Sequence, residues 1–167
     1  EAAMQVIEAI AEEKGCKLTV AQPAEVKKVR YGLEKQRFDY KTWKNLEITL
    51  AGNHQIDNAL LAIKVLEELN DLGYAVSEKA LRKGLQETKW PGRFTVVGKK
   101  PYFIVDGAHN ADAAKKLAET IEFYFTNRRI IFIMGVLRDK EYDRIIEQTH
   151  KYADQIITVA TPGNARA

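Results

Sequence analysis

The feature that most constrains the fold is an apolar run that ends in a short polar loop and leads directly into a helical pattern. Residues 103–106 read FIVD, and the loop DGAHN occupies residues 106–110. Residues 111–118 (ADAAKKLA) have the composition of a helix. This order predicts a strand, a loop and a helix, with Asp106 and His109 on the loop. Loops at the carboxyl ends of strands form the ligand crevice of open α/β sheets, and the rigid scaffold fixes their polar side chains.

The same pattern continues through the second half of the chain. Apolar stretches typical of buried parallel strands alternate there with helical stretches, at residues 102–105, 110–125, 129–136, 140–152 and 155–160. This alternation predicts the α/β class and a Rossmann-like open parallel sheet. We therefore expect Asp106 and His109 at the carboxyl end of a parallel strand. The loop at residues 135–139 should lie beside them.

The first half combines helices with antiparallel strands. Its pattern predicts helices at residues 2–14, 53–69 and 77–86, and strands at residues 16–21, 25–33 and 37–50. The sequence WPGR at residues 90–93 interrupts this pattern. Proline does not continue a helix, and glycine permits an unusual backbone turn. We place a domain boundary here, so that residues 1–88 and 89–167 form two domains.

Charge and cysteine content narrow the functional classes. The formal net charge of +3 is small for 167 residues. The basic residues of the strand region alternate with acidic and apolar ones, which favours solvated strand faces over a nucleic-acid site. Cys16 is the single cysteine, which excludes an internal disulfide, and its place at a predicted strand favours burial. No apolar run approaches the roughly 20 residues that span a membrane, so we expect a cytoplasmic protein without membrane contact.

Polar residues gather where the helix from residue 53 begins. His54, Gln55 and Asn58 fall within its first two turns, and His54 and Asn58 share a face because they are four residues apart. The unpaired amides and partial positive charge of a helix N-terminus suit a phosphate group. The alternative is that Asn53 caps the helix and the other side chains are polar surface.

Three further residues are candidates for ligand binding. Arg93 follows the rigid WPG turn, where a guanidinium can grip phosphate oxygens; the alternative is a surface arginine in a linker. Asp106 and His109 could contact a ribose hydroxyl, a purine edge or a metal ion, or they could serve only the turn itself. A metal is the weakest of these options because only two potential ligands lie close in sequence.

Taken in order, these segments resemble one family. LAGNHQ at residues 50–55 is followed by WPGR at residues 90–93, by DGAHN at residues 106–110, and by Gly135 with Asp139-Lys140. This series resembles the folylpolyglutamate synthase/dihydrofolate synthase family, the folate branch of the Mur ligase superfamily. The DGAHN form favours the folate branch over the peptidoglycan ligases.

The resemblance implies a fold and an activity. The fold is the Rossmann-like sheet of the Mur ligase C-terminal domain, preceded by the tail of the central ATPase domain. The activity is that of an ATP-dependent ligase: ATP phosphorylates a carboxylate of folate or dihydropteroate, and the amine of glutamate attacks the acyl phosphate. By resemblance, His54, Gln55 and Asn58 match a nucleotide-binding segment of the family whose asparagine, here Asn58, lies near the adenine. Arg93 reaches the phosphates, and Asp106 and His109 approach the nucleotide from the C-terminal domain. The role of Asp139 and Lys140 stays open.

The sequence departs from the family in one respect that bears on activity. It holds no phosphate-binding loop of the form GxxxxGK[ST]. We expect that loop and the Mg²⁺ ligands upstream of Glu1, further strands after Ala167, and therefore a fragment without activity of its own. Two alternatives stay open: another Mur-type ligase that acts on a peptidoglycan precursor, and a Rossmann-like binding module without a catalytic role.

Overall fold

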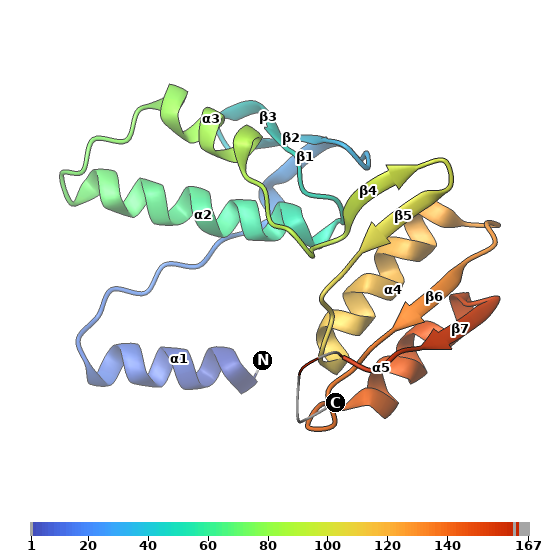
Figure 1. Cartoon of the computed structure of the whole chain (residues 1–167). Helices are drawn as coiled ribbons and strands as arrows, with labels where there is room; N and C mark the ends of the chain where they lie inside the picture. Colours follow the sequence, from blue (N-terminus) through green and yellow to red (C-terminus); the bar gives the residue numbers. More distant parts are fainter. Residues whose placement is uncertain (1, 162, 164–167) are drawn as a thin grey trace.

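The computed structural model describes residues 2–161 and residue 163 (Figure 1). Its first half contains the antiparallel sheet β1-β2-β3, with two helices packed against it. The strands are β1 (Val26–Arg30), β2 (Gln36–Tyr40) and β3 (Trp43–Ile48), and the helices are α2 (His54–Asp71) and α3 (Glu78–Glu87). Helix α1 (Ala2–Glu13) and the 3-10 turn η1 (Pro23–Glu25) precede them.

The core of the first half lies between the sheet and helices α2 and α3. It combines the apolar side chains that strands β2 and β3 turn inward with the apolar face of each helix: Phe38, Tyr40, Leu46, Ile48, Ile56, Ala59, Leu60, Ile63, Leu81 and Leu85. Helix α3 begins where the sequence predicts, because the Ser77 side chain accepts a hydrogen bond from the backbone N–H of Ala80. The predicted strand at residues 37–50 is divided in two, because the chain turns at Lys41, whose φ is +50°.

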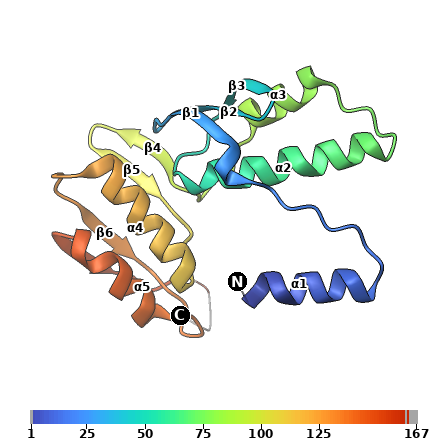
Figure 2. The same cartoon turned by 180° about the vertical axis from the view of Figure 1, so that it is seen from behind.

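The second half places two strand pairs against two helices. Strands β4 (Thr95–Lys99) and β5 (Tyr102–Val105) form an antiparallel pair, and β6 (Ile131–Met134) and β7 (Gln155–Thr158) form a parallel pair. Helix α4 (Ala111–Phe125) follows β5, and α5 (Tyr142–Thr149) with the 3-10 turn η2 (His150–Tyr152) connects β6 to β7. Figures 1 and 2 show α4 and α5 on the same side of these strands, so their other side has no helical layer.

This arrangement corrects the expected sheet in two respects. The parallel pairing holds for β6 and β7, but the hydrogen-bonded partner of β5 is the antiparallel β4. Asp106 therefore follows an antiparallel strand, not a parallel one as expected. The strands are also not buried: Ile131 and Ile133 are exposed, and so is every residue of β7, because helices cover only one face.

The segment at residues 16–21 is a further correction. No strand forms there; the backbone is irregular from Cys16 to Gln22. Lys17 and Thr19 are instead held to α2, since the Lys17 ammonium and the Thr19 hydroxyl both donate to the Glu68 carboxylate, at 2.5 and 2.9 Å. With no strand partner to cover it, Cys16 is exposed and not buried as expected.

Helix α4 connects the two halves. Ala51, which precedes α2, packs with Phe94 and Ile121 in a shared apolar cluster. The Tyr124 hydroxyl donates to the backbone carbonyl of Gly32 at 3.4 Å. These contacts hold the start of α2 beside α4. The boundary near residue 89 stays a prediction.

We expect the chain to associate with itself as its concentration rises. The outer face of α2 exposes Leu61 and Val65, and α1 exposes Val6, Ile7 and Ile10. Apolar faces of this kind favour association. Light scattering should give a weight-average mass that grows with concentration, and the double variant Leu61→Ser, Val65→Ser should reduce that growth. A constant monomer mass for the unmodified chain at high concentration would contradict this expectation.

Candidate functional site

A cavity of about 960 Å³ lies where helix α2 meets the second half of the chain. One wall is the start of α2, with His54, Gln55 and Asn58. Arg93 and Asp106 line the same cavity, from the turn before β4 and the loop after β5. Five of the six residues that the sequence singles out therefore line one cavity.

The three residues on α2 form a chain of hydrogen bonds. The Asn58 amide donates to Gln55 Oε1 at 3.0 Å, and Gln55 Nε2 donates to His54 Nε2 at 3.1 Å. Since Nε2 of His54 accepts, the proton of a neutral ring lies on Nδ1. That atom is buried without a hydrogen-bond partner. An unsatisfied buried donor is costly, and a ligand atom or a water molecule in the cavity would remove the cost.

The surroundings of His54 favour its neutral form. Burial lowers the pKa of His54 below its ordinary value of 6.5, and the positive charge of Lys116 on α4 lowers this pKa further. Asp106, Glu119 and Asp57 partly oppose the shift. The ring is thus uncharged at neutral pH and can only exchange neutral hydrogen bonds with a ligand.

The lowered pKa of His54 gives a testable pH dependence. Because the unfolded chain binds the proton more readily, the contribution of His54 to stability is fully present above the unfolded pKa of 6.5 and is lost in the window below it, as the pH falls through the folded pKa. His54→Gln should flatten the pH dependence in that window, measured by urea unfolding at several pH values. The matched control is His150→Gln, which alters an exposed histidine of η2 and should leave the slope unchanged. Equal slopes for the unmodified chain and His54→Gln would contradict the assignment.

Arg93 sits between two residues with a left-handed backbone. Gly92 has a φ of +78° and Phe94 a φ of +47°. Positive φ is easy for glycine but strained for phenylalanine. The Phe94 ring is buried, and Tyr124 and Phe125 on α4 lie beside it, with ring centroids 6.4 and 6.3 Å away. The Arg93 guanidinium lies 5.9 Å from the centre of the Trp90 ring, a distance that allows a cation–π interaction.

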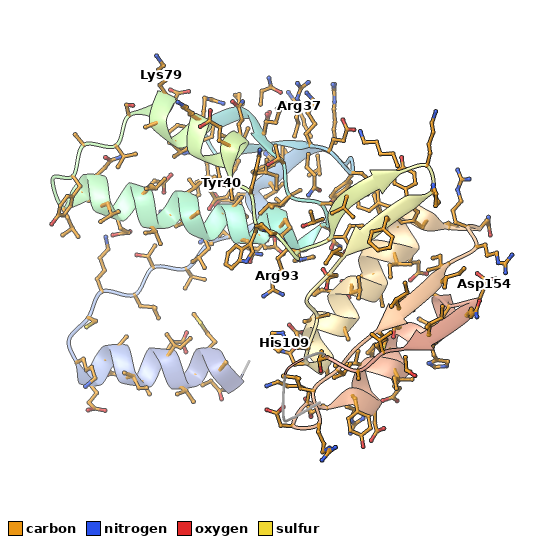
Figure 3. The ribbon with its side chains drawn as sticks, in the orientation of Figure 1. Arg37, Tyr40, Lys79, Arg93, His109 and Asp154 are labelled. Atoms are coloured by element: carbon orange, nitrogen blue, oxygen red, sulfur yellow. The ribbon has the colours of Figure 1, made fainter. Side chains whose placement is uncertain are left out.

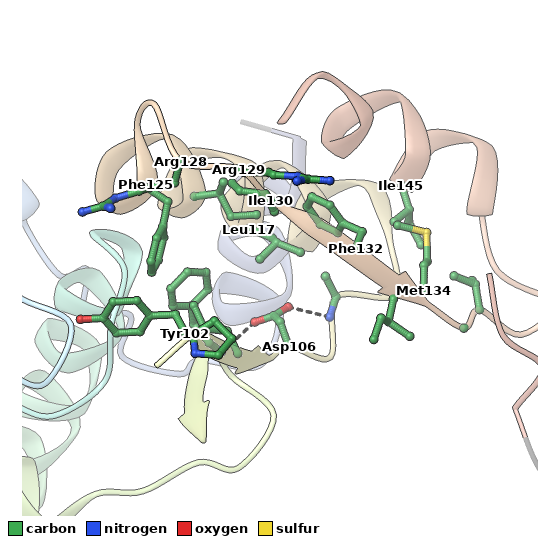
Figure 4. A pocket seen from close by; sticks show the side chains of 18 of the residues that line it. Tyr102, Asp106, Leu117, Phe125, Arg128, Arg129, Ile130, Phe132, Met134 and Ile145 are labelled. Atoms are coloured by element: carbon green, nitrogen blue, oxygen red, sulfur yellow. Dashed lines mark hydrogen bonds between the residues drawn. The ribbon is translucent and has the colours of Figure 1, made fainter. Parts of the chain in front are cut away.

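The Asp106 carboxylate accepts hydrogen bonds from backbone N–H groups of two segments, the turn before β4 and its own loop after β5. Its Oδ1 accepts from Ala108 and its Oδ2 from Phe94, both at 2.8 Å. Figure 4 shows this carboxylate with its two bonds. The Oδ1 bond agrees with the alternative that Asp106 stabilises its own turn. The Oδ2 bond reaches a second segment, the turn before β4, and no pattern in the sequence connects that turn with Asp106.

His109 is placed differently from the other five residues. It is exposed on the loop before α4 and is not among the residues that line this cavity (Figure 3). Its Nδ1–H donates to the carbonyl of Gly107 at 2.8 Å, since a carbonyl only accepts. In the neutral ring Nε2 is then the free acceptor. His109 would therefore contact only a part of a ligand that extends outside the cavity.

The cavity wall also includes two charged residues of α4 that belong to none of the motifs named above. Asp112 and Lys116 lie on α4, four residues apart, and both face the cavity. The Lys116 ammonium also pairs with Glu119 at 3.2 Å. In the sequence ADAAKK an acid and a base lie one helical turn apart, and this spacing is the only local pattern that could have indicated a role in the cavity. The same spacing is equally typical of a solvated helix face.

A second cavity, of about 640 Å³, lies between β5 and β6 against α4. Figure 4 shows its mostly apolar lining, which includes Leu117, Ile130 and Phe132. Asp106 and Ala108 line it together with Gly135 and Val136. This confirms the expectation that the loops after β5 and β6 are neighbours.

Neither a metal-binding cluster nor a membrane-spanning helix occurs in the part of the chain that the structure describes. Across residues 2–161 and 163, no group of three or more His, Cys, Asp or Glu side chains is placed to hold a metal ion. Within the same residues, no helix is long and apolar enough to cross a membrane.

Comparison with known sequences gives consistent matches. The family described as "Mur ligase, glutamate ligase domain" matches residues 92–167. The chain is 38% identical over 126 residues to dihydrofolate synthase/folylpolyglutamate synthase of Bacillus subtilis, covering 72% of this chain and 29% of that protein. It is 28% identical over 137 residues to folylpolyglutamate synthase of Lacticaseibacillus casei, covering 79% of this chain and 32% of the relative. The chain thus spans about a third of the length of these relatives.

Solved structures agree with the sequence matches. Folylpolyglutamate synthase of Thermotoga maritima superposes with a TM-score of 0.77 at 32% identity, over 98% of this chain and 39% of that one. Folylpolyglutamate synthase of Mycobacterium tuberculosis complexed with ADP gives a TM-score of 0.85 at 24% identity, over 98% of this chain and 37% of that one. At that lower identity the second likeness concerns the fold alone.

Proposed function

Since this chain belongs to the folylpolyglutamate synthase/dihydrofolate synthase family of Mur ligases, we propose that it is part of an ATP-dependent ligase that joins glutamate to folate or dihydropteroate. The observation that carries the proposal is the cavity of about 960 Å³, called the joint cavity from here on, which is lined by five polar side chains from three separate segments of the sequence. Its volume lies within the range of roughly 300–1,000 Å³ typical of ligand pockets.

The cavity walls suit the parts of ATP. The hydrogen-bonded chain of His54, Gln55 and Asn58 offers amide and imidazole groups to a purine edge. Arg93 lines the same cavity, and its guanidinium can bind phosphate oxygens with two hydrogen bonds. Both the ADP complex of the Mycobacterium tuberculosis protein and a complex of folylpolyglutamate synthase with AMPPCP and folate support a nucleotide as the ligand.

The proposed reaction transfers a phosphoryl group and then an acyl group. A folate carboxylate oxygen attacks the γ-phosphorus of ATP, the bond to the β-phosphate oxygen breaks, and ADP leaves. The amine nitrogen of glutamate then attacks the acyl carbon, the C–O bond breaks, and phosphate leaves as the nitrogen loses a proton. Arg93 stabilises the negative charge that shifts between oxygens in the first step. His54, which is neutral, orients the nucleoside without adding charge.

Magnesium does not fit the described residues as a resident ion. Mg²⁺ prefers several oxygen ligands in octahedral geometry, and the described part of the chain offers no such cluster. We therefore propose that the Mg²⁺ ligands lie elsewhere in the ligase.

The direct test is ligation by the complete ligase that contains this sequence. We expect ATP-dependent incorporation of labelled glutamate into dihydropteroate or a reduced folate, with one ADP released per bond. We expect the 167-residue chain alone to show no turnover, because it holds no phosphate-binding loop. Activity of the complete ligase only on a UDP-linked peptidoglycan precursor would instead support the other Mur-type function, and no ligation of any kind would support a binding module.

We expect His109→Ala in the complete ligase to raise the KM for ATP with little change in kcat. An interaction made equally in the ground state and the transition state changes KM alone, and His109 offers only an exposed imidazole that does not line the cavity. Steady-state kinetics at varied ATP would measure both constants, with His150→Ala as the control. A large fall in kcat at saturating ATP would contradict a nucleoside-binding role.

A further inference from the structure

The side chain of Gln36 is completely buried at the start of β2, and the site described above does not use it. Its Nε2 donates to the carbonyl oxygens of Leu50 and Gly52, at 2.6 and 2.8 Å. Since carbonyl oxygens only accept, the NH₂ group must face them, with one hydrogen for each bond. Oε1 is buried without a hydrogen-bond partner. A buried amide with one unsatisfied atom is costly, so packing alone does not account for a glutamine here.

The two bonds hold the segment at residues 50–52, which connects β3 to α2. Gln36 pairs with Ile48, the last residue of β3, so its side chain lies beside the chain that leaves this strand. The carbonyl of Gly52 also accepts from the N–H of Gln55 at 3.1 Å, in the first turn of α2. Gly52 has a φ of +103°, a conformation that glycine adopts easily. Gln36 therefore binds a carbonyl that also fixes where α2 begins.

The same segment lies directly against the His54 ring. A Cβ added to Gly52 would lie 2.7 Å from Cε1 of His54 and 3.0 Å from its Nδ1. Because interiors are closely packed, a shift of the Gly52 backbone toward the ring would displace the ring. His54 is hydrogen-bonded to Gln55, and Gln55 is hydrogen-bonded to Asn58. The displacement would thus reach all three polar residues that α2 contributes to the joint cavity.

We propose that Gln36 is a positioning residue for the nucleoside of ATP, which acts by holding the segment at residues 50–52 and with it the His54 ring. Gln36 is not among the residues that line the joint cavity, so it acts through the start of α2 and not by contact with the ligand. The proposal rests on the proposed function, because it assigns this wall of the cavity to the purine. A nucleoside contact is made equally in the ground state and the transition state, so weakening it raises the KM for ATP and leaves kcat nearly unchanged.

The test is steady-state kinetics of the complete ligase with Gln36→Met, at varied ATP. Methionine is a long, unbranched side chain like glutamine, but it donates no hydrogen bond. We expect the KM for ATP to rise roughly 3- to 10-fold, the effect of about one net hydrogen bond, with kcat nearly unchanged.

The matched control is Thr149→Val in α5. It removes another completely buried donor, the Thr149 hydroxyl, which is bonded to the Ile145 carbonyl at 2.9 Å. Both variants should lower the midpoint of thermal unfolding, so the kinetics are measured well below both midpoints. Thr149→Val should leave the KM for ATP unchanged, because Thr149 does not line the joint cavity or hold a segment that does.

Three results would overturn the proposal. An unchanged KM for ATP in Gln36→Met would show that Gln36 does not affect nucleoside binding. An equal rise in KM in Thr149→Val would attribute the effect to lost stability, and a fall in kcat at unchanged KM would attribute it to the chemical step. If Gln36→Met does not fold, Gln36→Asn replaces it, because its amide is one methylene shorter and cannot reach both carbonyls. Gln36→Asn should show the same rise in KM.

The NMR signal of the His54 ring separates this proposal from the proposed function. In the complete ligase without nucleotide, Gln36→Met should shift this signal, which is assigned through its loss in His54→Gln. Thr149→Val should leave the signal in place. An unchanged His54 signal in Gln36→Met would show that Gln36 does not position the ring, whatever the enzyme does. A shifted signal in a protein without ligase activity would locate the failure in the proposed function.

Discussion

Arg93→Ala in the complete ligase should lower kcat for glutamate addition by about 10²-fold or more at saturating ATP. The expectation follows from the location of Arg93, half-buried at the wall of the joint cavity on a turn fixed on both sides. A guanidinium held in place meets the charge that develops on the transferred phosphoryl group, so its loss affects the chemical step most. Arg93→Lys should recover only part of the rate, because an ammonium group does not form the paired hydrogen bonds of a guanidinium.

The control for this prediction is Arg144→Ala. Arg144 is an exposed arginine on α5 that pairs with Glu147 at 3.4 Å. Removal of the Arg144 side chain should leave kcat and the KM for ATP unchanged. Near-normal kcat for Arg93→Ala at saturating ATP would mean that Arg93 is a surface residue of a linker and that its assignment to the phosphates is wrong.

Leu60→Ala should remove about 2–5 kcal/mol of folding stability, the usual range for a fully buried leucine. Leu60 is completely buried on the inner face of α2, in the cluster with Phe38, Leu46 and Ile63. Such a loss is a large share of the roughly 5–15 kcal/mol that stabilises a typical domain. Urea unfolding of the 167-residue chain should show a lower midpoint with an unchanged slope.

The neighbouring residue supplies the control. Leu61 lies one position further along the same helix, yet 57% of its surface is exposed. Leu61→Ala makes the same chemical change at nearly the same place in the helix, and it should cost less than about 0.5 kcal/mol. Equal losses for the two variants would contradict the packing of α2 described above.

Local sequence patterns predicted most of the helices and strands, because each depends on neighbouring residues. Asn110 accepts from the backbone N–H of Ala113 and begins α4 where the DGAHN loop ends. The strand at residues 102–105 forms with the predicted bounds. The segment at residues 16–21 was predicted wrongly, because its apolar residues suit a strand but a strand also needs a partner. No partner strand lies beside this segment in the described part of the chain.

Pairing between strands and contacts between distant segments could not be predicted from local patterns. The sequence around β5 is the same whether its neighbour is the antiparallel β4 or a parallel strand, so the expected parallel sheet was wrong for Asp106. The meeting of His54, Gln55 and Asn58 with Arg93 and Asp106 followed from the family resemblance and not from spacing. The bond from Phe94 to Asp106 joins residues 12 positions apart and has no signature in either segment.

The central claim is that the joint cavity holds ATP between the start of α2 and the turn that carries Arg93. The most direct measurement is a crystal structure of the complete ligase with a non-hydrolysable ATP analogue and a folate substrate. We expect the purine beside His54 and Asn58, the phosphates within hydrogen-bond distance of the Arg93 guanidinium, and Asp106 still bound to the Phe94 and Ala108 N–H groups. A nucleotide bound elsewhere, with this cavity filled by other parts of the protein, would contradict it.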